Sequence, residues 1–184
     1  VTWQSDRQDG SDLGVFAQRY GGLHPRLLRV DPTGNGVLEP GEEVQVRPSW
    51  RNPTPAAQTL TGTADRAVGP IGATYLLTDA SATYGTIPAG ATGACVDCYA
   101  FSVSDPPARP MVHWDASVVE TTAPVVTEKG WILHVGRSFT DVSVSSPFYR
   151  FIETLVHHWV TGGCSATAYC PATPTTREQM AVFV

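Results

Sequence analysis

Basic residues are scarce in this chain, which has 12 Lys and Arg against 17 Asp and Glu among its 184 residues. The formal net charge of −5 argues against binding to nucleic acid or to anionic membrane surfaces, since both need clustered positive charge. Long apolar runs are also missing, because no stretch approaches the roughly 18 residues that a membrane-spanning helix needs. We therefore expect no nucleic-acid partner and no membrane insertion.

Recognisable catalytic motifs are absent as well. The sequence has no Gly-x-Ser-x-Gly elbow, no His-Glu-x-x-His zinc motif and no glycine-rich phosphate loop. Acid pairs such as Glu42 and Glu43 could hydrolyse glycosides only if the fold brought them to a suitable position. The sequence therefore predicts a protein that is not an enzyme.

The cysteines are few and fall into two close pairs, Cys95 with Cys98 and Cys164 with Cys170. Local pairs in a proline-rich, lysine-poor chain are typical of disulfides that staple short loops in an oxidising compartment. The alternative is a four-thiolate zinc site, for which the first pair has a familiar spacing and the second pair a wider one. We expect two disulfides and a secreted, extracellular protein.

Glycine and proline, by contrast, are abundant, with 17 and 15 copies. Between residues 23 and 136 they interrupt short runs of β-branched and aromatic residues, as turns interrupt strands. Apolar residues alternate in 43–47, which is what one buried sheet face requires. The predicted strands are 27–30, 43–50, 59–64, 73–78, 83–87, 98–103, 111–121 and 131–135. We expect a mainly β chain whose residues 23–136 form an antiparallel immunoglobulin-like or jelly-roll β-sandwich.

Residues 1–22 differ from the rest because they are polar and carry only isolated apolar side chains. Neither a helical period nor a sustained alternation runs through them, so they have little reason to fold alone. We expect an extended arm whose apolar residues need a groove on another molecule. Those self-assembly candidates are Trp3, Leu13, Val15 and Phe16.

The pattern changes again in residues 137–184, where helical spacing appears. Six apolar residues recur at i, i+3, i+4, i+7, i+8 and i+11, which predicts an amphipathic helix over 148–159. Pro147 suits its first turn, and Gly162 and Gly163 suit its end. The apolar set is Phe148, Phe151, Ile152, Leu155, Val156 and Trp159. A second helix is predicted from about residue 175 or 176, which makes 137–184 a small helix-loop-helix unit.

The segment 31–42 has the spacing of a calcium loop. Oxygen ligands fall at positions 1, 3, 5, 7 and 12, and Gly36 is the turn glycine at position 6. The candidate ligands are Asp31, Thr33, Asn35, the Val37 carbonyl and Glu42. Calcium is therefore the expected cofactor. The alternative is an Asx-type turn in which Gly36 supplies a positive φ and the acids face water.

The remaining aromatic and histidine residues favour structural roles. Four tryptophans lie within apolar patterns and are predicted to be core: Trp50, Trp114, Trp131 and Trp159. His157 and His158 diverge by about 100° on a helix and cannot share a ligand, so a solvated helix face is predicted for them. His113 and His134 lie on separate predicted strands, and the sequence does not fix the distance between them.

Two segments resemble known families. Residues 36–42 resemble the Gly-x-Leu-x-Pro-Gly-Glu segment that opens many bacterial secreted immunoglobulin-like domains. The blocks 139–142, 148–155, 160–163, 169–171 and 176–181 together resemble one S-layer homology repeat. That family's helix-loop-helix units usually occur three in tandem and hold surface proteins on cell-wall polysaccharide. The resemblance places Arg177 where the family's glycan-contacting arginine lies.

Two functions follow from these patterns. The first is a structural, self-assembling subunit of an extracellular bacterial surface filament or matrix, in which the arm docks non-covalently on a neighbouring copy of the chain. The alternative is a cell-wall polysaccharide-binding anchor module of a larger secreted protein. Self-association of the pure protein favours the first, and capture of cell-wall glycan by a monomer favours the second.

Overall fold

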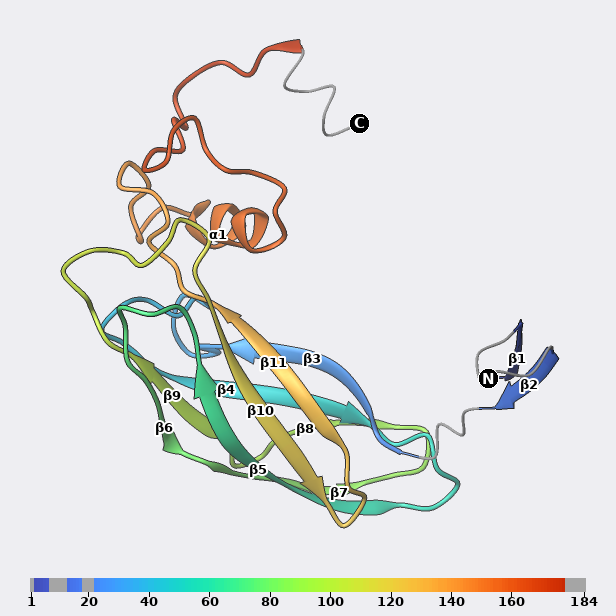
Figure 1. Cartoon of the computed structure of the whole chain (residues 1–184). Helices are drawn as coiled ribbons and strands as arrows, with labels where there is room; N and C mark the ends of the chain where they lie inside the picture. The colour runs from blue at the N-terminus through green and yellow to red at the C-terminus, as the bar shows by residue number, and fades with distance from the viewer. Residues whose placement is uncertain (1, 7–12, 18–21, 178–184) are drawn as a thin grey trace.

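The computed structural model describes residues 2–6, 13–17 and 22–177. It is mainly β, with two antiparallel sheets facing each other and one short helix, α1 (Tyr149–His157), at one end of the sandwich (Figure 1). The expectation of a mainly β chain built on a β-sandwich is confirmed. No helix among the described residues has the length and apolar character needed to cross a membrane.

The two sheets are assembled from strands that are distant in sequence. The first sheet has the order β11-β10-β5-β7, and these strands span Glu128–His134, Asp115–Ala123, Gln58–Val68 and Ser81–Ile87. The second has the order β3-β4-β9-β6, with β8 also paired to β4. These strands span His24–Val30, Glu43–Arg51, Tyr99–Val103, Tyr75–Asp79 and, for β8, Thr92–Ala94. All of these pairings are antiparallel.

Each of the eight predicted strands overlaps a strand of the structure, with ends that differ by up to four residues. Two differences have a clear physical reason. The three-residue strand β8 was not predicted, because so short a segment carries no alternation. The run predicted over 111–121 begins as a strand only at Asp115. Met111 and Val112 lie in the preceding connection and are partly exposed, so apolar character alone extended that prediction too far.

A buried carboxylate lies at the centre of the sandwich core. Glu120 on β10 is fully buried and accepts hydrogen bonds from four aromatic side chains. The indole nitrogens of Trp50 and Trp131 lie 3.2 and 2.6 Å from its Oε2. The Tyr84 and Tyr99 hydroxyls donate to Oε1, the latter at 2.8 Å. Both sheets therefore share one polar network inside a largely apolar core.

A second apolar cluster packs α1 and the segments around it. Phe139, Tyr149, Ile152 and Val156 are buried in this cluster together with Val37 from the turn after β3. Leu38, which forms a backbone bridge to Val135, belongs to the sandwich core, whereas its neighbour Val37 belongs to this second cluster. The helix predicted over 148–159 is thus confirmed in its central part, and its buried face is turned toward the sandwich.

Two short strands lie in the N-terminal segment that the sequence predicts to be an extended arm. Strands β1 (Thr2–Asp6) and β2 (Leu13–Ala17) pair antiparallel as a two-stranded sheet, with Trp3 opposite Phe16 and Gln4 opposite Val15. Both segments are extended strands that pair with each other, and the arm predicted over residues 1–22 stays a prediction. Cross-strand pairing supplies backbone hydrogen bonds that a search for side-chain periodicity cannot detect.

Both predicted disulfides are present, Cys95–Cys98 and Cys164–Cys170, and no cysteine is free. The four-thiolate zinc alternative is excluded, since all four sulfurs are bonded to one another in pairs. The intact mass of the non-reduced chain should be about 4 Da below that of the fully reduced chain, two hydrogens for each bridge. A mass equal to that of the reduced chain would contradict both bridges.

The Glu120 network predicts a large stability effect. Replacing Glu120 with Ala leaves four buried donors without an acceptor, so unfolding free energy should fall by about 3–5 kcal/mol. The matched control is Glu128→Ala on β11, because Glu128 is an exposed acid, and its effect should stay within about 0.5 kcal/mol. Chemical denaturation measures both. Equal effects of the two substitutions would show that the network contributes little.

Candidate functional site

Three histidines and one aspartate converge where α1 meets the sandwich. His113 precedes β10, Asp115 begins it, His134 ends β11, and His157 ends α1. Asp115 and His134 are direct cross-strand partners, so the register of β10 on β11 brings them together. One ligand atom from each of the four side chains lies within 4.8 Å of all the others.

Asp115 is the common partner of the three imidazole rings. Its Oδ2 lies 3.0 Å from His113 Nε2, and its Oδ1 lies 2.8 Å from His134 Nδ1. His157 Nδ1 lies 3.2 Å from both carboxylate oxygens. Partial burial alone would raise the pKa of Asp115, but the hydrogen bonds from the three rings outweigh it and hold the pKa well below its usual value.

His134 is held between two carboxylates. Its Nε2 lies 3.0 Å from Oε2 of Glu153, a buried residue on the inner side of α1. Glu153 is itself fixed by Ser138, whose N–H and hydroxyl donate at 3.0 and 2.6 Å. Burial lowers the pKa of His134, but the hydrogen bonds to Asp115 and Glu153 reverse that effect and raise it. Each ring nitrogen of His134 therefore faces a carboxylate oxygen, Nδ1 that of Asp115 and Nε2 that of Glu153.

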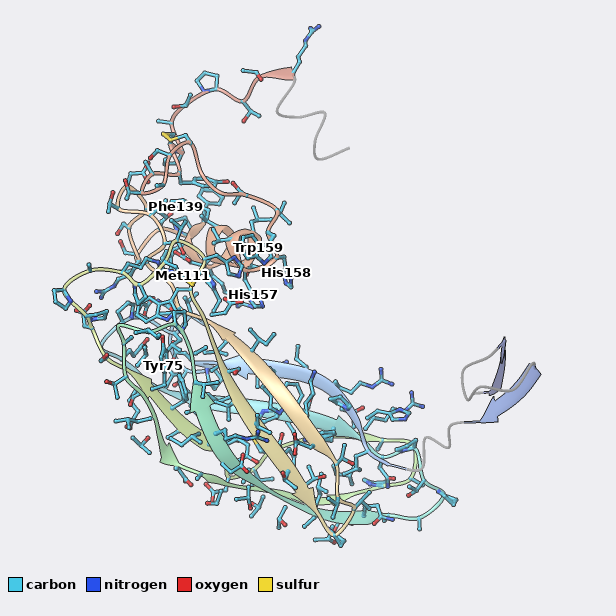
Figure 2. The ribbon with its side chains drawn as sticks, in the orientation of Figure 1. Tyr75, Met111, Phe139, His157, His158 and Trp159 are labelled. Atoms are coloured by element: carbon cyan, nitrogen blue, oxygen red, sulfur yellow. A yellow bond between two sulfur atoms is a disulfide. The ribbon has the colours of Figure 1, made fainter. Side chains whose placement is uncertain are left out.

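Aromatic rings and a partly buried arginine lie beside the cluster. The Trp159 indole stacks on His113 with ring centroids 3.8 Å apart and planes within 8°. Figure 2 shows Trp159, His157 and His158 together on the side of the helical unit that faces the sandwich. Arg109 lies over the Trp114 ring at 5.2 Å and donates to the carbonyls of Val135 and Gly136. Arg109 thus links the connection before β10 to the segment that follows β11 by hydrogen bonds.

These contacts correct two sequence predictions. His157 does not lie on a solvated helix face, because it hydrogen-bonds to Asp115, whereas His158 is exposed as predicted. Trp50, Trp114 and Trp131 are core residues as predicted, but Trp159 is 76% exposed. Helical periodicity alone assigned Trp159 to the core, although it lies past the helix end with a positive φ.

The predicted calcium loop forms a compact turn. Gly36 has a φ of 82°, and its N–H donates to Asp31 Oδ2 at 3.3 Å. The Val37 N–H donates to Asn35 Oδ1 at 2.9 Å. Thr33 is exposed. The turn thus has the Asx-type hydrogen bonds of the alternative interpretation, and calcium binding stays a prediction.

Glu42 lies in a cluster of three carboxylates with Asp31 and Glu39, of which the calcium-loop spacing predicted only Asp31 and Glu42. Glu39, which the spacing does not include, accepts from the Asn35 amide at 2.7 Å, and its N–H donates to Glu42 Oε2 at 3.0 Å. Burial, followed by the neighbouring charges of Glu39 and Asp31, raises the pKa of Glu42 to about 7. A cation among these carboxylates would relieve their repulsion.

A pocket of about 740 Å³ lies between this turn, β3 and α1. Its lining includes Arg29 and Asp31 on one side and Arg150, His157 and His158 on the other. The pocket therefore borders both the calcium-type loop and the histidine cluster, and its walls carry charges of both signs.

The other predicted site residues lie apart from the cluster. Arg177 is exposed at the C-terminal limit of the described residues. Most of the predicted second helix lies outside the described residues. The side chains of Trp3, Leu13, Val15 and Phe16 also lie outside them, so only their backbone pairing is known.

Comparison with protein-family models found no match to this chain, and comparison with curated protein sequences found none either.

Calcium binding has a specific test at Glu42. In calcium-free buffer near pH 8, Glu42→Gln should raise the melting temperature, because it removes one of three repelling carboxylates. Added calcium should raise the melting temperature of the wild type and leave that of Glu42→Gln nearly unchanged. Glu43→Gln, an exposed neighbour, is the matched control and should respond like the wild type. A calcium response retained in Glu42→Gln would refute the ligand assignment.

Proposed function

We propose that this chain is a secreted, non-catalytic structural subunit that assembles with copies of itself outside the cell. The two disulfides support a non-reducing setting. The resemblance of residues 36–42 to bacterial immunoglobulin-like domains, and of the last quarter of the chain to one S-layer homology repeat, supports a bacterial surface location.

One observation carries the proposal: α1 and its flanks have two apolar faces, and only one is covered. Tyr149, Ile152 and Val156 are buried against the rest of the chain. Phe148 and Phe151 on the other side are 66% and 65% exposed. Large exposed aromatic side chains are costly in water and are enriched where proteins associate. A second copy of the chain is the partner we propose for this face.

The N-terminal segment supplies the second contact of the proposed assembly. Trp3, Leu13, Val15 and Phe16 would dock on the β-sandwich of a neighbour. Both sheets of the sandwich end in edge strands, β7 and β11 in one and β3 and β6 in the other. Edge strands have unpaired backbone donors and acceptors to which an added strand can bind. Two different contacts on each subunit would generate a head-to-tail polymer.

The assembly proposal is tested by light scattering and electron microscopy of the purified chain. We expect high-mass polymers from the wild type, and monomers or short oligomers both from deletion of residues 1–22 and from the double substitution Phe148→Ser, Phe151→Ser. Ile71→Ser, at a fully exposed apolar residue of the sandwich, is the matched control and should polymerise normally. A wild type that stays monomeric at high concentration would overturn the proposal.

The same material distinguishes the alternative function. If the wild-type chain is a monomer that binds purified cell-wall polysaccharide, and Arg177→Ala removes that binding, the chain is an anchor module instead. Polymers that form without polysaccharide, and that Arg177→Ala leaves intact, support the structural subunit.

A further inference from the structure

The cluster at the junction of the sandwich and α1 has the composition of a transition-metal site. It offers three imidazole nitrogens, His113 Nε2, His134 Nδ1 and His157 Nδ1, and one carboxylate from Asp115. Imidazole nitrogen suits zinc, copper and nickel, whereas calcium and magnesium prefer oxygen ligands throughout. The ligand chemistry therefore differs from that of the turn at 31–42.

The spacing of the ligand atoms also fits one ion. Zinc bonds nitrogen at about 2.0 Å, so ligand atoms around a tetrahedral ion lie about 3.3 Å apart. In the structure the four ligand atoms lie within 4.8 Å of one another, and Asp115 already contacts all three rings. Small rotations of the side chains would bring four ligands onto one ion, without a change in the backbone.

One of the three imidazole ligands, His134, has the outer-shell partner typical of a metal site, whereas His113 Nδ1 is buried without a hydrogen-bond partner. A metal-bound histidine usually donates its other ring N–H to a carboxylate, which fixes the ring and its tautomer. The Nε2 of His134 is placed against Glu153 in this way, and Ser138 in turn orients Glu153. Among the described residues, the rings of His113 and His157 hydrogen-bond only to Asp115. Metal binding at these two rings would therefore break no hydrogen bond except those to Asp115, which is itself a ligand.

We propose that His113, Asp115, His134 and His157 bind one divalent transition-metal ion of the zinc class, which fastens α1 to the β-sandwich. Four protein ligands fill a tetrahedral site and leave no open position, which is typical of structural zinc. The ligands come from the connection before β10, from β10, from β11 and from α1, so one ion would cross-link all of these segments. This inference goes beyond the proposed assembly and does not depend on it.

The test uses the untagged, disulfide-bonded full chain, stripped of metal with a chelator and titrated with zinc chloride by calorimetry. We expect one zinc ion per chain and a higher melting temperature with zinc. His157→Ala should weaken zinc binding at least 100-fold, because it removes a ligand. His158→Ala, the exposed neighbour at the same helix end, is the matched control and should bind within about twofold of the wild type. Glu153→Gln should weaken binding about 10- to 100-fold through the outer shell.

His113→Gln provides a second ligand variant in case His157→Ala folds poorly. His113→Gln changes a residue outside regular secondary structure and should also abolish tight binding. Cobalt should give the intense visible absorption of a four-coordinate ion in the wild type and not in His113→Gln. Glu42→Gln should leave zinc binding unchanged. A wild-type chain that binds no zinc would overturn the proposal, as would His157→Ala and His113→Gln variants that bind zinc like His158→Ala. In either case the cluster would be a hydrogen-bonded junction only.

Discussion

The junction between the sandwich and the helix depends on the hydrogen bonds that three histidines make to the Asp115 carboxylate. Three histidines from the connection before β10, from β11 and from α1 all bond to this one side chain. Each of these contacts is charge-assisted and partly shielded from water, so each is stronger than a hydrogen bond on an open surface. Loss of Asp115 would remove the hydrogen-bond acceptor of His113 and His157 and leave His134 with Glu153 alone among the carboxylates. The position of α1, and with it the exposed Phe148 and Phe151, therefore depends on Asp115.

Strand β10 carries two carboxylates that perform similar tasks on opposite sides of one sheet. Alternate residues of the strand face inward, so Glu120 lies in the core with Ala116 and Val118, while Asp115 lies on the outer face at the strand's end. Glu120 accepts hydrogen bonds from four aromatic side chains of both sheets, and Asp115 is hydrogen-bonded to three imidazole rings. In each case one acceptor satisfies donors from segments distant in sequence, which ties the segments together more specifically than apolar packing alone.

The sequence predicted those features that local pattern encodes. Alternation in 43–47 located β4, helical spacing located α1, and the close cysteine pairs predicted both disulfides. The histidine cluster could not be predicted, because 44 positions separate His113 from His157 and only strand register brings Asp115 opposite His134. One signal was available: Asp115 and Glu120 are acids within runs of strand-forming residues. An acid in such a run needs a buried partner, and histidine and tryptophan side chains are suitable donors.

The central claim is that Asp115 and its histidines hold α1 on the sandwich, and amide hydrogen exchange tests it most directly. Asp115→Asn keeps the shape of the side chain but removes its charge and one acceptor. If the account is right, the amides of α1 exchange much faster in this variant than in the wild type, while those of β5 and β9 keep their protection, because the core does not depend on the junction. Unchanged protection of α1 in Asp115→Asn would contradict the account.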